Sequence, residues 1–225
     1  MGVKGLKRVF RTGLFQAPQT IEGITRSQVG NVVGGTWKGI DYMRIKPANV
    51  SNPRTAGQVD QRSKFSTTLK FLQSMTDFLR VGFKLYANKM TQFNAAMSYN
   101  LNNAITGSYP NFTIDYANAL VSRGGLVGAA NAAVSSSGGL VEFTWDDNTG
   151  SGNAQATDKA LLVVYNPTKD ESIYDSAGAV RSATSQNLGM PASYVGDDVE
   201  AFIGFLSEDG KEVANSVYIG SVTVA

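Results

Sequence analysis

The chain has 225 residues, among them 20 Lys and Arg, 18 Asp and Glu, and neither histidine nor cysteine. Hydrophobic residues make up 42% of the chain, which is enough for a folded core and excludes extensive disorder. The missing cysteines exclude disulfides and thiolate chemistry, and the missing histidines exclude Ser-His-Asp catalysis and His-ligated metals. We therefore predict a protein that is not an enzyme and needs no cofactor.

Charge is segregated along the chain. Residues 1–100 carry 15 Lys and Arg against four acidic residues, a formal +11, whereas residues 101–225 carry five against 14, a formal −9. Opposed halves of this kind indicate an interaction. The basic half can bind nucleic acid, or it can bind the acidic half of another copy; alternatively, both sets of charges lie on solvated faces.

Residues 1–50 are predicted to form a basic arm with short strands. Residues 30–35 are typical of a short strand that ends in a glycine turn, and residues 36–45 alternate imperfectly as a strand does. Such an arm has little core of its own, so we expect it to pack on this chain or a neighbour. The predicted contact residues, for assembly or for nucleic acid, are Lys4, Lys7, Arg8, Arg11, Arg26, Lys38, Arg44, Lys46, Arg54 and Arg62.

Residues 51–106 predict an α-helical hairpin. The first helix begins either at Asn52, with Pro53 in the first helical position, or at Thr55, with Gln58 completing a capping box. Apolar residues at steps of three and four then predict one helix of about 25 residues, which ends or bends at Gly82. A second helix is predicted to begin near Thr91.

Residues 107–225 predict an antiparallel β-sandwich of the immunoglobulin or fibronectin type III kind, so that the fold class is α+β. Trp145 is expected in its core, and the lack of a disulfide favours the fibronectin-like variant. Short apolar alternations separated by turn residues lie at 112–116, 126–134, 140–145, 160–166, 180–188, 199–206 and 213–224.

The chain contains few motifs that are typical of a chemical site. Neither the P-loop nor the dinucleotide-binding glycine motif occurs. The loop at residues 146–153 is rich in oxygen ligands for Ca²⁺, but it lacks the closing glutamate of an EF-hand, and we interpret it as a turn. Aromatic residues stand among the basic ones at residues 8–11, 37–38 and 42–44, an arrangement that can stack on single-stranded nucleic acid. No secretory signal and no membrane-spanning segment is expected.

Several motifs taken together are similar to a family of small uncharacterised proteins from Bacteroidetes and their phages and prophages. In that family a helical front part precedes a β-rich, immunoglobulin-like tail, and the resemblance implies no catalytic residues. The motifs are Val29-Gly30-Asn31-Val32-Val33-Gly34 with Trp37-Lys38-Gly39, Asn52-Pro53-Arg54-Thr55 with Gln58, Arg62 and Phe65, Met90-Thr91 with Phe93, Asn94 and Ala96, and Ser216 with Tyr218 and Gly220.

These observations favour a structural protein of a bacteriophage virion, associated with the capsid or head. It is expected to self-assemble through its basic arm and its acidic sandwich, and to contact other copies, other virion proteins and packaged nucleic acid, with no membrane partner. One alternative is an immunoglobulin-like binding module that is secreted or lies on the bacterial cell surface. Another is a nucleic-acid-binding protein that uses the basic N-terminal region.

Overall fold

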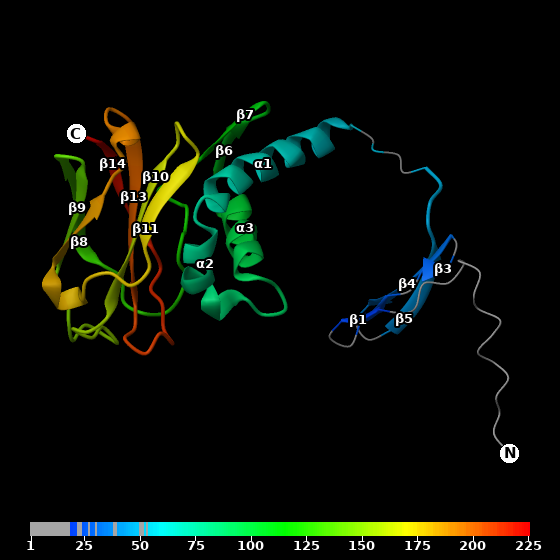
Figure 1. The fold of residues 1–225 in the computed structure, drawn as a ribbon, viewed down its shortest axis with the longest axis horizontal. Helices are drawn as coiled ribbons and strands as arrows, with labels where there is room; N and C mark the ends of the chain where they lie inside the picture. Colours follow the sequence, from blue (N-terminus) through cyan, green and yellow to red (C-terminus); the bar gives the residue numbers. More distant parts are fainter. Residues whose placement is uncertain are drawn as a thin grey trace, which may run out of the picture. The chain divides into compact units, whose positions relative to one another are not determined.

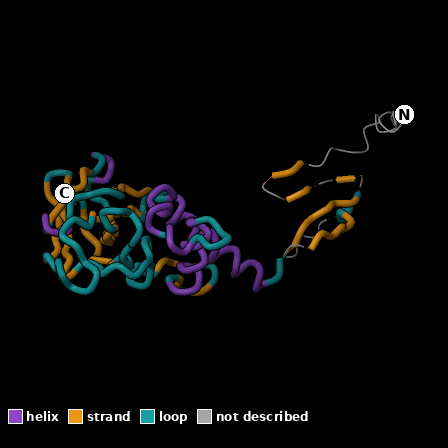
Figure 2. The backbone as a smooth tube through the Cα atoms, turned by 90° about the horizontal axis from the view of Figure 1, so that it is seen from below, coloured by secondary structure: helices purple, strands orange, loops and turns teal. Residues whose placement is uncertain are grey.

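A computed structural model describes residues 19–21, 24–26, 28–29, 31–37, 40–49, 52 and 54–225. The chain divides into two compact units, residues 1–54 and residues 55–225 (Figures 1 and 2). The predicted helical segment lies in the second unit from residue 55 onward, and the whole predicted strand segment lies there too. The predicted α+β class, with helices before a series of antiparallel strands, is confirmed at this level.

The first unit contains short antiparallel strands. β1 (Gln19–Ile21) pairs with β2 (Ile24–Arg26), and a second sheet has the order β3 (Gln28–Val29), β4 (Val32–Trp37), β5 (Ile40–Ile45). The prediction that a glycine turn ends the strand at residues 34–35 is wrong, because β4 continues through both glycines to Trp37. The Tyr42 ring lies over Gly35, where an added Cβ would be 3.1 Å from it, so the ring uses the space that the missing side chain leaves.

Two of the predicted helix starts are confirmed. The Thr55 hydroxyl oxygen accepts a hydrogen bond from the Gln58 N–H at 3.4 Å, so Thr55 rather than Asn52 caps the first helix. Thr91 caps a later helix in the same way through the Asn94 N–H at 3.2 Å. The helical elements are α1 (Ala56–Gln73), α2 (Thr76–Gly82), η1 (Lys84–Tyr86) and α3 (Gln92–Asn103).

The prediction of one continuous helix is wrong, because the helix breaks between α1 and α2, whereas the predicted end at Gly82 is confirmed, since α2 ends there. The Ser74 hydroxyl bonds the Phe71 carbonyl at 3.1 Å and the Ser172 hydroxyl of the neighbouring sheet at 2.6 Å. Such side-chain bonds compete with the helical backbone pattern. The break lets Met75 enter the core fully, whereas Phe65, which begins the predicted apolar stripe, is 48% exposed.

The strands of the second unit form two larger sheets and one hairpin. The sheets have the orders β11-β10-β13-β14 and β12-β9-β8, and the hairpin is β6-β7. Each predicted strand region contains a strand, while β6 and β11 were not predicted. The bounds are β6 (Ile105–Ser108), β7 (Asn111–Ile114), β8 (Ala130–Ser137), β9 (Leu140–Asp146), β10 (Lys159–Asn166), β11 (Glu171–Asp175), β12 (Ser185–Gly189), β13 (Asp198–Leu206) and β14 (Val217–Thr223), with the short helices η2 (Arg181–Ala183) and η3 (Ala192–Tyr194) between them.

The second unit has three layers, with the four-stranded sheet in the middle (Figure 1). Leu161, Val163 and Tyr165 of β10 pack with the helices in one core. The alternate residues Leu162 and Val164 pack in a second core with the three-stranded sheet. Because both faces of β10 are covered, the strand is a continuous apolar run rather than an alternation. Trp145 is 3% exposed in the second core, as predicted.

Partly buried tyrosines line the first core and give it a pH dependence. Burial, with the nearby Glu200 and Asp170 carboxylates, raises the pKa of Tyr116 to about 12. The same kind of burial raises the pKa of Tyr165 and of Tyr218 above the usual range. In the unfolded chain these phenols lose their protons near pH 10. The folded state therefore holds protons that the unfolded state has released once the pH exceeds 10.

Alkaline pH is thus expected to destabilise this fold. Stability from the neutral tyrosines is fully present below pH 10 and falls as the pH rises from 10 toward 12, because the unfolded state then binds fewer protons. Urea denaturation across this interval, with the phenolate absorbance followed in parallel, measures the effect. An unfolding free energy that stays constant while the phenols of the folded protein titrate near pH 10 would contradict the assignment.

Candidate functional site

Strand β5 presents apolar side chains on both of its faces. It lies at an edge of the sheet β3-β4-β5, and all six of its residues are exposed. Ile40 is 70% exposed, Met43 76%, Ile45 76% and Tyr42 45%. Side chains alternate along a strand, so Ile40 and Tyr42 share one face while Met43 and Ile45 share the other. An uncovered apolar edge strand is a typical site of pairing with another chain.

The backbone of β5 also has an open side. The Lys46 N–H donates to the Asn31 carbonyl at 2.6 Å, which places Lys46 in a hydrogen-bonded position relative to β4. Such positions alternate in antiparallel pairs, so Arg44 and Tyr42 also direct their backbone groups toward β4. Met43 and Ile45 then direct their N–H and C=O groups away from β4. Both the side chains and the backbone of this strand can therefore accept a partner.

The structure brings two of the predicted contact residues together at this strand. Arg44 lies on β5 and Lys46 follows two positions later on the same side, and both are exposed. Arg54 is exposed at the end of the first unit, and Arg62 is exposed on α1 in the second. The backbone of Arg26 lies in β2. Outside the described residues lie Lys4, Lys7, Arg8, Arg11 and Lys38.

The boundary between the two units preserves the separation of charge. Residues 1–54 contain nine Lys and Arg and two acidic residues, a formal +7. Residues 55–225 contain 11 Lys and Arg and 16 acidic residues, a formal −5. Net charge of opposite sign therefore falls on the two units of the chain.

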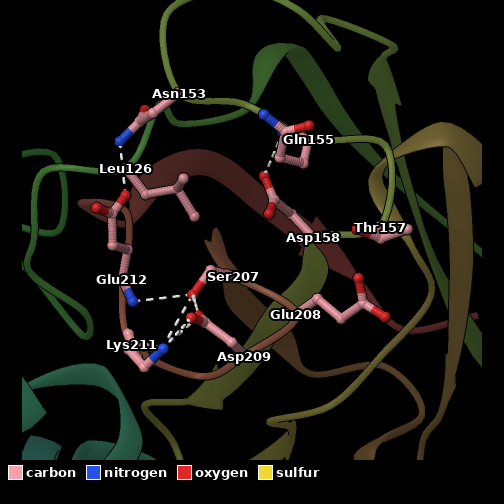
Figure 3. Close-up of a pocket in the computed structure, with 10 residues that line it drawn as sticks. All are labelled: Leu126, Asn153, Gln155, Thr157, Asp158, Ser207, Glu208, Asp209, Lys211 and Glu212. Atoms are coloured by element: carbon pink, nitrogen blue, oxygen red, sulfur yellow. Dashed lines mark hydrogen bonds and ion pairs between the residues drawn. The ribbon is translucent and has the colours of Figure 1, made fainter.

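An acidic hollow of about 480 Å³ opens on the second unit (Figure 3). Its lining comes from Leu126, from residues 153–158 and from residues 207–212. Four carboxylates line it, and two of them are paired: Asp158 with Arg181, and Asp209 with Lys211 at 2.8 Å. Glu212 accepts a hydrogen bond from the neutral Asn153 amide at 2.7 Å and forms no ion pair with a residue that the structure describes.

Glu208 is distinctive among the acidic residues of the second unit. Of the 16 Asp and Glu in residues 55–225, it is the one whose carboxylate has no hydrogen bond or ion pair with any residue that the structure describes. In the close-up its carboxylate lies on the side of Thr157, apart from Lys211 (Figure 3). The hollow therefore carries two uncompensated negative charges, those of Glu208 and Glu212.

The turn that carries these acids is fixed by its own hydrogen bonds. The Ser207 hydroxyl oxygen accepts from the N–H groups of Lys211 at 3.1 Å and Glu212 at 2.9 Å. Asp209 accepts from the Lys211 ammonium, the Ser207 hydroxyl and the Lys211 N–H, and these bonds hold the pKa of its carboxyl well below the usual range. The turn thus presents Glu208 and Glu212 from a preformed backbone.

The described strands and helices from β2 to β14 lie almost wholly within residues 24–220, which match a family of unknown function, DUF6266. This chain belongs to DUF6266. The prediction of an uncharacterised family is thereby confirmed, and the match spans both the basic and the acidic unit. No curated protein and no solved structure matches the chain.

The oxygen-rich loop of this DUF6266 protein uses its side chains within the fold. Asp147 accepts a hydrogen bond from the Thr149 N–H at 3.0 Å, and Asn148 accepts one from Arg181 at 2.6 Å. Asp146 accepts from Asn131 at 2.6 Å. In the part of the chain that the structure covers, no group of three or more potential Asp, Glu, His or Cys ligands gathers. None of the helices there combines the length and the apolar character needed to cross a bilayer.

A buried arginine beside the hollow was not predicted from the sequence. Arg181 is 0% exposed, and its guanidinium donates to Asp158 at 3.1 and 3.2 Å, to the carbonyls of Val127 and Gly128 at 2.8 and 3.2 Å, and to Asn148. It lies 3.8 Å from the centre of the Phe205 ring. Three loops that are distant in sequence are thereby fixed beneath the hollow.

Proposed function

We propose that this DUF6266 protein is a structural, self-assembling protein of a bacteriophage virion, and that it is not an enzyme. The observation that carries the proposal is β5, a basic edge strand with exposed apolar residues on both faces. A strand of this kind gains stability by burying its apolar surface against another molecule.

Charge supports another copy of the chain as the partner. The unit that contains β5 has a formal +7 and the unit that follows has a formal −5, so a front-to-rear contact between copies joins opposite charges. Such a contact joins two different surfaces, and it can therefore generate rings or extended assemblies of many copies. Shells and tubes built from many copies can use contacts of this class.

The virion assignment draws on the sequence motifs that resemble proteins of Bacteroidetes phages and prophages. On this proposal the protein is located in the virion, associated with the capsid or head. Its partners are other copies, other virion proteins and, at the basic unit, packaged nucleic acid.

We also propose that the strands of the second unit form a fibronectin type III-like sandwich. The orders β8-β9-β12 and β11-β10-β13-β14 correspond to strands A-B-E and C′-C-F-G of immunoglobulin-like folds. The two sheets also share one apolar core, which includes Trp145. This architecture supports a module that presents surfaces rather than one built around a reaction centre.

Assembly is expected to depend on salt. Full-length protein at micromolar concentration should elute as a large oligomer in low salt and as smaller species in high salt, because the contact between the oppositely charged units is screened. Size exclusion with light scattering measures this directly. A monomer at every salt concentration would overturn the proposed function.

Nucleic-acid binding is the second candidate function, since Tyr42, Arg44 and Lys46 lie on one side of β5. Filter binding to single-stranded DNA over a salt series separates the two. Binding whose logarithm falls steeply with the logarithm of salt, by a protein that stays monomeric, favours this candidate. A slope near zero removes it.

A further inference from the structure

We propose that β5 of one copy docks in the acidic hollow beside residues 207–212 of a second copy, where Arg44 and Lys46 face Glu208 and Glu212. This inference rests on the proposed self-assembly and specifies its two contact surfaces. It begins from two sets of unpaired charge: the Arg44 and Lys46 side chains have no ion pair with any described residue, and Glu208 has none either.

The charge of the strand disfavours the simplest alternative, in which two β5 strands pair with each other. In an antiparallel pair related by a two-fold axis, residues on the same face of the sheet stand opposite one another. Asp41 lies on the opposite face from Arg44 and Lys46, so it cannot stand across from either of them. Such a pair would therefore gather the basic residues of both copies without a compensating acid, and like charges directly opposite are destabilising.

The hollow has the negative charge that would compensate the cations of β5. Glu208 and Glu212 supply negative charge that no cation of the described chain compensates, while Asp158 and Asp209 are already paired. Leu126 and the loops at residues 153–158 form the rest of the lining, so an apolar side chain can enter beside the ion pairs. The volume of about 480 Å³ accommodates a few side chains of an extended strand. The fixed turn limits the ordering that binding requires.

The geometry of the contact is head to tail. Each copy has one β5 and one hollow, so a pair of copies joined by one such contact leaves one β5 and one hollow unused, and further copies can add at both ends. Docking of β5 in the hollow of its own chain would instead use both surfaces at once and stop growth. These two arrangements differ in the mass of the particles that they form.

Two full-length variants with complementary defects test the contact. The first, Ile40→Asn with Arg44→Asn, removes an apolar and a cationic side chain from the face of β5 that is proposed to meet the hollow, and keeps the hollow; the second, Glu208→Lys with Glu212→Lys, keeps the strand and reverses the charge of the hollow. All four positions are exposed, so circular dichroism should match that of the wild type. Each variant alone should be monomeric by light scattering. Mixed in equal amounts, they should form a dimer that does not grow, because only one β5 and one hollow are intact and complementary.

A matched control and a charge swap complete the experiment. Glu142→Lys, an exposed acid on β9 away from the hollow lining, should leave the assembly of the wild type unchanged. Arg44→Glu combined with Glu208→Lys in one chain should recover at least part of the assembly that Arg44→Glu alone loses.

The outcomes separate failure of this contact from failure of the proposed function. A wild type that is monomeric in all conditions overturns both the contact and the proposed self-assembly. Docking of β5 in the hollow of its own chain would give this same result. A wild type that assembles while the mixed variants stay monomeric overturns only the contact between β5 and the hollow. If the hollow variant still dimerises while the strand variant does not, β5 pairs with the β5 of another copy. That result would contradict the inference.

Discussion

Replacing Arg181 with alanine is expected to lower the free energy of unfolding by about 3–5 kcal/mol, the range found when one partner of a buried ion pair is removed. Asp158, 1% exposed at its side chain, would then hold a buried charge without its cation. The carbonyls of Val127 and Gly128 would lose their donors as well. Burial lowers the pKa of Arg181 and the Asp158 carboxylate opposes that shift, so the pair depends on both members.

Urea denaturation of the full chain measures this loss. Arg80→Ala is the matched control, because Arg80 pairs with Asp77 at 2.7 Å while its side chain is 69% exposed, and such a surface pair contributes less than about 1 kcal/mol. Arg181→Lys should also be destabilising, since a lysine has three donors and lacks the planar fork. An unfolding free energy for Arg181→Ala equal to that of the Arg80 control would show that the network is not needed for stability.

Replacing Phe71 with alanine is expected to cost about 3–5 kcal/mol for a different reason, the cavity left in a closely packed core. Phe71 is 0% exposed, and its ring centre lies 5.0 Å from that of Tyr165 and 6.0 Å from that of Phe202. It joins α1 to the central sheet. Loss of the Phe71 ring is therefore expected to weaken the packing of the helical layer on the central sheet, and not only the stability of α1.

Two probes show whether those layers unfold together. Helical circular dichroism reports α1 to α3, and fluorescence of Trp145 in a Trp37→Phe background reports the second core. Both should give one coincident transition at lower urea than in the parent. Phe65→Ala, on the same helix but 48% exposed, should change the midpoint little. Loss of the helical signal well before the tryptophan signal would show that the helices are a separate unit.

The sequence predicts the elements of this fold where one local rule dominates. Thr55 and Thr91 precede apolar periodicities as helix caps should, and β10 and β13 are apolar runs long enough to indicate buried strands. The break at Ser74 escapes prediction because the hydroxyl that stabilises it reaches Ser172, 98 residues away. β11 escapes because its short run, bounded by Glu171 and Asp175, has no distinct pattern.

The candidate site is less predictable from sequence than the fold. The imperfect alternation over residues 36–45 predicts a strand there, but only the structure shows that the strand β5 begins at Ile40 and that all six of its residues are exposed. The hollow joins Leu126 to two loops that lie tens of residues away, and Arg181 bonds backbone carbonyls that carry no sequence signal. Segregated charge is the one feature of the site that the sequence reveals directly.

If the protein assembles as proposed, the exposure of β5 has a consequence for the time between synthesis and assembly. A newly made copy exposes an apolar edge strand before it binds another copy. Exposed edge strands of this kind promote aggregation. Arg44 and Lys46 act as gatekeepers during this interval, because their like charges keep solitary copies apart. In the proposed assembly, the same two cations protect the subunit from premature aggregation and then direct it to the acidic hollow of the next copy.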